Sequence, residues 1–155
     1  MRSRLYESFT IFIEDNSILL PEGGRCYSKK SNEFIAEATF GSNLVDGEPT
    51  WKWAEEHKDD LEVMKRCCDA ELITMKKCGL VPAPYYFERV AILSRKNSDY
   101  RQEIFYCEQY IKMVEDFYIQ NGTLGIADVR ESPRFKRIVK RLQQAKKLYA
   151  KQISL

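Results

Sequence analysis

The last 24 residues of the chain, 132–155, contain eight Lys or Arg residues and no Asp or Glu. The whole protein has a formal net charge of only +2, so residues 1–131 carry about −6, from 17 basic against 23 acidic side chains. A segment without acidic residues cannot neutralise its own charge. It either pairs with acidic groups elsewhere in the fold or presents a cationic face to an anionic partner.

The apolar residues of this segment recur every three or four positions, which is the spacing of an amphipathic α-helix. Ser132-Pro133 is a strong helix start, a cap residue followed by proline in the first turn. On a helical wheel the apolar side chains fall within an arc of about 120°, and most basic ones fall within an arc of about 140°, largely opposite. The apolar set is Phe135, Ile138, Val139, Leu142, Ala145 and Tyr149. The candidate partner-binding set is Arg134, Lys136, Arg137, Lys140, Arg141, Lys147 and Lys151.

Three interpretations of this cationic face stay open. It is a solvated surface that pairs with acidic groups such as Asp59, Asp60 and Glu62, or it binds an acidic protein surface, or it binds the phosphates of a nucleic acid. A membrane surface is disfavoured, because interfacial helices bring several Trp or Phe side chains to the apolar side, where Phe135 stands alone.

The N-terminal part, residues 1–48, is predicted to be β-rich. Phe9, Ile11 and Ile13 alternate with other residues, turn signals follow, and the segment 33–40 alternates again, which favours strands. A short helix opened by Ser31 is the alternative for 33–40. We expect a small antiparallel element that must pack on helices, because an isolated hairpin is marginal in water.

From Pro49 onward the sequence is typical of helices. A first turn near Thr50 is followed by a long helix that ends at Cys78 before Gly79, and further helices are expected over 84–96, 100–120 and from Pro133 almost to the chain end. The predicted fold class is therefore α+β, predominantly α, with a small N-terminal antiparallel β element packed on about four helices. Residues 1–155 are expected to form a single domain, with 1–48 as its β-rich element and 49–155 as its helical part.

Composition places the chain among cytoplasmic globular proteins. No run of about 18 apolar residues predicts a membrane span, and the start Met1–Arg4 lacks the apolar stretch and cleavage site of a signal peptide. The five cysteines are odd in number and show no metal-ligand spacing, so we expect free thiols: Cys26, Cys67, Cys68, Cys78 and Cys107.

Catalytic signals are weak. His57 is the single histidine and lies in a charged stretch, and Gly23-Gly24 does not match a phosphate-binding loop. We expect no enzyme activity, no cofactor and no metal. A small hydrolase or nuclease that uses His57 ranks third, after the binding of a protein and the binding of a nucleic acid.

The stretch 84–112 resembles one tetratricopeptide-type helical hairpin. Phe87, Val90 and Ala91 occupy its aromatic, large apolar and small positions, and Asp99-Tyr100 lies at the turn between the helices. Three positions depart from the family pattern: Ser94 replaces a Tyr, Glu103 replaces an Ala, and Cys107 replaces an aromatic residue. The resemblance implies a protein-binding role and transfers no functional residue.

The sequence therefore favours a non-enzymatic cytoplasmic protein that binds a macromolecular partner as an adaptor, regulator or inhibitor, a class that includes proteins of phages and mobile elements. The favoured partner is a protein with an acidic surface. The alternative is a nucleic-acid-binding module that uses the basic C-terminal helix. The sequence leaves the oligomeric state open.

Overall fold

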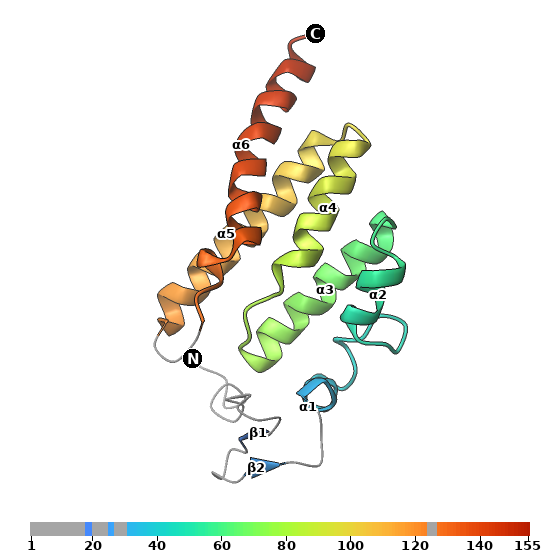
Figure 1. The fold of residues 1–155 in the computed structure, drawn as a ribbon, viewed down its shortest axis with the longest axis vertical. Helices are drawn as coiled ribbons and strands as arrows, with labels where there is room; N and C mark the ends of the chain where they lie inside the picture. Colours follow the sequence, from blue (N-terminus) through green and yellow to red (C-terminus); the bar gives the residue numbers. More distant parts are fainter. Residues whose placement is uncertain (1–17, 20–24, 27–30, 124–126) are drawn as a thin grey trace. The chain divides into compact units, whose positions relative to one another are not determined.

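The computed structural model describes residues 18–19, 25–26, 31–123 and 127–155, and the chain divides into two compact units (Figure 1). One unit joins Met1–Trp53 with Arg66–Pro82, and the other joins Ala54–Lys65 with Ala83–Leu155. This division does not decide whether the units form a single domain, so that expectation stays a prediction. The predicted strand over residues 9–13 lies outside the described residues.

Helices dominate the first unit. Its elements are β1 (Ile18–Leu19), β2 (Arg25–Cys26) and α1 (Ser31–Ala38). It also contains the first turn, residues 50–53, of α2 (Thr50–Glu56) and residues 66–78 of α3 (Leu61–Cys78). The two strands pair antiparallel over only two residues each, with Ile18 opposite Cys26 and Leu19 opposite Arg25. The helix α3 ends as predicted before Gly79, which has a left-handed φ of 65°.

The predicted α+β class is wrong. The described residues contain six α-helices, and β1 and β2 are too short to form the expected β element. The segment 33–40, predicted as a strand, is helical over residues 33–38, which belong to α1, and continues into a turn. Its apolar residues at 34 and 38 suit a helix as well as a strand, and in the folded chain Phe34 and Thr39 are buried.

The end of α1 shows why a strand does not continue there. The amide of Phe40 donates to the carbonyl of Glu37 (3.1 Å), and the amide of Gly41 donates to the carbonyl of Ala36 (2.7 Å). These two bonds form the paired terminal turn that commonly ends helices, with Phe40 in the left-handed conformation (φ 52°) and its side chain 98% exposed. Residue 40 therefore contributes nothing to a buried strand face.

The second unit is a helical bundle, and its helices lie where the sequence predicted them. Its elements after the linker are α4 (Pro84–Lys96), α5 (Tyr100–Asn121), the short 3₁₀ helix η1 (Val129–Glu131) and α6 (Pro133–Ile153). Helices α4 and α5 form a hairpin, and α6 packs on both of them (Figure 1). Local signals fix the ends: Pro84 and Pro133 lie in first turns, and the Asp99 side chain accepts a hydrogen bond from the Gln102 amide (3.0 Å).

The apolar spacing of the hairpin predicts one buried interface formed by Val90, Ala91, Ile104, Ile111 and Val114. Val90, Ala91 and Val114 are buried, whereas Ile104 and Ile111 are only half-buried. The Phe87 ring packs against Tyr110, with ring centroids 4.8 Å apart. The likeness to a tetratricopeptide hairpin stays a prediction.

Candidate partner-binding face of helix α6

Helix α6 packs through the apolar arc that the sequence indicated. Ser132 caps the helix by accepting a hydrogen bond from the Phe135 amide (3.2 Å), and Phe135, Ile138 and Ala145 are buried. The Phe135 ring lies 6.1 Å from the Tyr110 ring of α5. The cationic arc therefore faces away from the apolar core, and its residues divide into two groups.

Three arginines on the edge of α6 nearest α4, called the inner arginines here, are Arg134, Arg137 and Arg141. Two of them pair with Glu88 of α4, whose side chain is only 6% exposed. The Arg134 guanidinium donates to Glu88 Oε2 (2.8 Å), and Arg137 donates through Nε to Oε1 (2.6 Å). Arg134 also lies over the Tyr85 ring, 4.8 Å from its centroid.

The Glu88 carboxylate is kept ionised by these arginines. Burial by itself would raise the pKa of Glu88, but the hydrogen bonds and charges of Arg137 and Arg134 outweigh it and hold that pKa below its ordinary value. Reciprocally, the hydrogen bond to Glu88 raises the pKa of Arg137. These charge-assisted hydrogen bonds from the two arginines to Glu88 join α6 to α4.

The third inner arginine serves a second buried carboxylate. Glu103 of α5 is fully buried and accepts from Arg141 Nη1 (2.9 Å) and from Arg95 of α4 through Nε (3.0 Å). Arg95 also donates to the backbone carbonyl of Arg141 (3.3 Å). One glutamate thus connects all three helices of the bundle.

The residues that depart from the tetratricopeptide pattern line this polar interior. The buried Ser94 hydroxyl donates to the Val90 carbonyl (2.7 Å) and accepts from the side-chain amide of Gln102 (2.9 Å). Cys107 is buried nearby. Its burial, and to a lesser extent the charge of Glu103, raises the pKa of its thiol to about 12. A hydrogen-bonded polar cluster is thus built into an otherwise apolar hairpin core.

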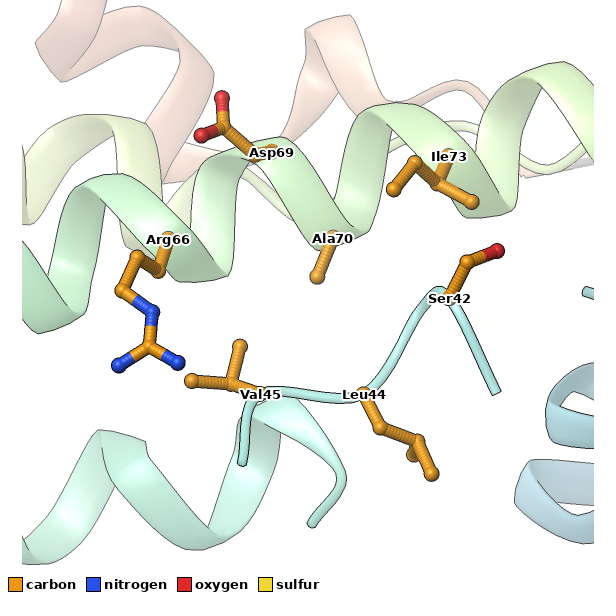
Figure 2. Close-up of a pocket in the computed structure, with 7 residues that line it drawn as sticks. All are labelled: Ser42, Leu44, Val45, Arg66, Asp69, Ala70 and Ile73. Carbon is orange, nitrogen blue, oxygen red and sulfur yellow. The ribbon is translucent and has the colours of Figure 1, made fainter. Parts of the chain in front are cut away.

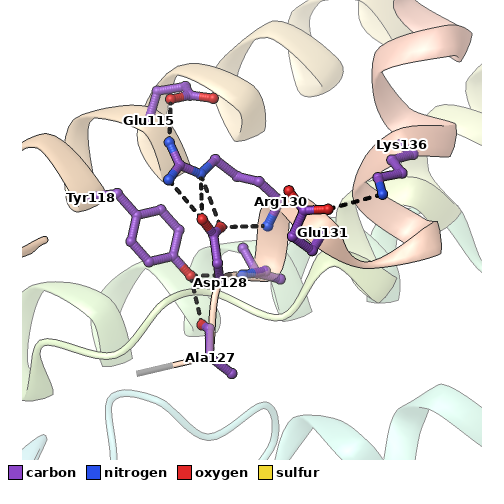
Figure 3. A network of polar contacts seen from close by, with 8 residues as sticks. Glu115, Tyr118, Ala127, Asp128, Arg130, Glu131 and Lys136 are labelled. Atoms are coloured by element: carbon purple, nitrogen blue, oxygen red, sulfur yellow. Dashed lines mark hydrogen bonds and ion pairs between the residues drawn. The ribbon is translucent and has the colours of Figure 1, made fainter. Parts of the chain in front are cut away.

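A further network fixes the segment that leads into α6 (Figure 3). The Tyr118 hydroxyl donates to the Ala127 carbonyl (2.9 Å) and accepts from the Val129 amide (2.8 Å). Arg130 lies over the Tyr118 ring at 4.6 Å and donates to Asp128 and Glu115. The hydrogen bonds to Asp128 and then to Glu115 raise the pKa of Arg130, and the bond from Arg130 lowers the pKa of Asp128. The start of α6 is therefore held to α5.

The remaining cations on the opposite edge of the arc, called the outer lysines here, are Lys136, Lys140, Lys147 and Lys151, and all four are exposed. Lys136 pairs with the exposed Glu131 at 3.1 Å. Within the part of the chain that the structure describes, no ion pair involves Lys140, Lys147 or Lys151. Among the described residues, these three are therefore the cations of the face without an ion-pair partner.

The structure thus separates residues that the sequence grouped together. The helical wheel predicts that Arg137, Lys140, Arg141 and Lys147 are exposed. Arg137, Lys140 and Lys147 are exposed, whereas the Arg141 side chain is only 22% exposed. The anticipated acidic partners Asp59, Asp60 and Glu62 do not pair with α6. Asp59 pairs with Arg89 (2.7 Å), Asp60 caps the start of α3, and Glu62 pairs with Lys65 (2.9 Å).

Sequence reasoning missed Glu88 and Glu103 as the partners of the inner arginines. A signal was present, because both glutamates interrupt apolar stripes of the hairpin: Glu88 follows Phe87, and Glu103 stands at a small-residue position. A charged residue at such a position is rarely buried unless it is paired.

A separate pocket of about 190 Å³ lies in the first unit, between the 42–45 loop and α3 (Figure 2). Its lining residues are Ser42, Leu44, Val45, Arg66, Asp69, Ala70 and Ile73. Arg66 forms an ion pair with Asp46 through both of its terminal nitrogens, and this hydrogen bonding lowers the pKa of Asp46. The pocket contains none of the residues predicted from the sequence to bind a partner.

The hypothesis of a hydrolase or nuclease concerns His57, possible metal ligands and the cysteines. His57 lies in the turn between α2 and α3 and is half-buried. In the described part of the chain, no three His, Cys, Asp or Glu side chains gather where they could hold a metal ion. Of the five cysteines predicted to be free thiols, four are buried free thiols in the structure: Cys67, Cys68, Cys78 and Cys107. The side chain of Cys26 lies outside the described residues. Burial raises the pKa of Cys67 to about 12. None of the described helices has the length and apolar character needed to span a bilayer.

The chain matches no protein-family model, no curated protein and no solved structure.

Proposed function

We propose that this protein is a non-enzymatic, cytoplasmic binding protein that engages a protein partner with an acidic surface, as an adaptor, regulator or inhibitor. The observation that supports this proposal is the set of exposed lysines on a helix fixed to the bundle by buried carboxylates. Lys140, Lys147 and Lys151 are exposed and have no ion-pair partner in the described residues.

Preorganisation is the reason why this arrangement suits binding. The inner arginines and the buried Phe135 hold α6 on the hairpin, so the outer lysines are displayed on a rigid backbone. Binding then orders only side chains and not the helix itself, which lowers the entropic cost of association. Complementary charge also steers the encounter with an acidic partner.

Binding of a nucleic acid is the second candidate. It is favoured by one observation: the cations of α6 that have no ion-pair partner among the described residues are all lysines, and a lysine binds a phosphate as a point charge.

Affinity capture with the full chain tests the proposal. The bait is compared with a variant carrying Lys140→Gln, Lys147→Gln and Lys151→Gln, before and after nuclease treatment. We expect protein partners that survive nuclease, are released by salt and are absent from the variant. Partners lost on nuclease treatment would favour the second candidate, and identical capture by both baits would reject α6 as the binding face.

A matched control keeps the number of charges equal. The variant Lys58→Gln, Lys76→Gln and Lys77→Gln removes three exposed lysines from other parts of the chain. We expect it to capture the same partners as the unchanged protein.

A further inference from the structure

The outer lysines form a narrow row along one side of α6. At 1.5 Å per residue, Lys136 and Lys151 lie about 22 Å apart along the helix axis, and the four side chains fall within about 60° of the wheel. Between Lys140 and Lys147, the exposed Gln143 and Gln144 lie on either side of the row, and the side-chain carbonyl of Gln144 accepts a hydrogen bond from Arg95 (3.2 Å). The row therefore offers charge and hydrogen bonds.

Apolar anchors are absent from this row. The aromatic residues of α6, Phe135 and Tyr149, are buried and half-buried on the opposite arc. A folded protein partner normally binds through a desolvated apolar centre with aromatic or arginine anchors. Single-stranded nucleic acid normally binds by stacking its bases on exposed aromatic rings. Neither contact is available along the outer lysines.

Carboxylates limit the extent of the free charge. Glu131 of η1, 79% exposed, pairs with Lys136, and Glu108 of α5, half exposed, pairs with Lys146 at 2.7 Å. The cationic surface is about one helix wide and suits a single extended chain.

We infer that the outer lysines bind a linear acidic peptide segment, one in which Asp or Glu recurs at every second residue. In an extended chain such side chains lie about 6.6 Å apart on one side. This distance is close to the axial separation of about 6 Å between Lys136 and Lys140, and between Lys147 and Lys151. The inference rests on the proposed function, since it specifies the part of the acidic partner that makes the contact.

Fluorescence anisotropy tests the inference directly. The probe is a labelled peptide of about ten residues with alternating Glu and Ser, long enough to follow the row when extended. We expect binding to the full-length protein that weakens as salt rises. The Lys140→Gln, Lys147→Gln, Lys151→Gln variant should lose about tenfold in affinity, since each exposed ion pair contributes a fraction of 1 kcal/mol. The Lys58→Gln, Lys76→Gln, Lys77→Gln control should bind within about twofold of the unchanged protein.

Three competitor probes separate the possible failures: a folded acidic domain of the same net charge as the peptide, a single-stranded DNA and a duplex. Lysine-dependent binding of the folded domain without binding of the peptide would overturn the inference and leave the proposed function standing. Lysine-dependent binding of a nucleic acid alone would overturn both. Equal loss in the two triple variants, or no binding by any probe, would also overturn both.

Discussion

The two edges of α6 carry the same charge but differ in what they do. The inner arginines lie against buried glutamates of α4 and α5, whereas three of the outer lysines have no ion-pair partner among the described residues. The difference matches the chemistry of the side chains. A planar guanidinium meets a carboxylate through two nitrogens, and a lysine ammonium is a strongly hydrated point charge on a flexible stem. One basic helix therefore has a structural edge and an edge available for binding.

The strongest test of the structural edge is Glu103→Ala. It removes the fully buried carboxylate shared by Arg95 and Arg141 and leaves both guanidinium groups without their partner. We expect the free energy of unfolding to fall by about 3 to 5 kcal/mol, as measured by urea denaturation. The matched control is Glu108→Gln, which breaks the exposed pair with Lys146 and should change stability by less than about 0.5 kcal/mol. Equal effects of the two variants would contradict the division of α6 into two edges.

The second prediction uses the acid dependence of Glu88. Its folded-state pKa lies below the ordinary value of 4.5, so its stabilisation is present above that pH and is lost as pH falls through the folded pKa. Near neutral pH, Glu88→Gln should cost about 1 to 3 kcal/mol. The difference between the two proteins should shrink as the pH is lowered below 4.5. Denaturation curves across pH 3–7 measure this, and a constant difference would show that Glu88 acts through packing rather than charge.

A smaller effect is expected from Tyr118→Phe, which probes the segment before α6. The variant keeps the ring under Arg130 but leaves the Ala127 carbonyl and the Val129 amide without the hydroxyl that pairs with them. We expect a loss of about 1 to 2 kcal/mol in thermal or urea unfolding. Tyr149→Phe, on a half-buried residue of α6, is the control and should be neutral. No difference between them would mean that this network does not hold the start of α6.

The smallest effect on stability should come from the outer lysines. Replacing Lys140, Lys147 and Lys151 by Gln should shift the free energy of unfolding by less than about 0.5 kcal/mol, because exposed charges without partners contribute little. Circular dichroism melting measures the shift. A clear destabilisation would show that these lysines are structural, and it would remove the contrast with the inner arginines.

Several features of the fold followed from the sequence because their causes are local. Pro84, Asp99 and Ser132-Pro133 start helices by themselves, and Gly79 ends one, so the bounds of α4, α5 and α6 could be predicted within a residue or two. The apolar arc of α6 was likewise readable, because it depends only on helical periodicity.

The region near α1 shows where local reasoning fails. Alternation over 33–40 satisfies a strand, yet the same residues place 34 and 38 on one helical face, and only tertiary contacts select between these two arrangements. The bonds that end the helix at Phe40 and Gly41 leave no extended segment for strand pairing.

By itself the sequence determined that this protein has a basic amphipathic helix at residues 133–153, with an apolar face for packing. Only the tertiary structure decided which of its basic side chains pair with buried carboxylates. Glu88 lies 46 and 49 residues from Arg134 and Arg137, and Glu103 lies 38 residues from Arg141. Helical periodicity is a property of neighbours in the chain, whereas the partner of a long charged side chain depends on which helices pack together.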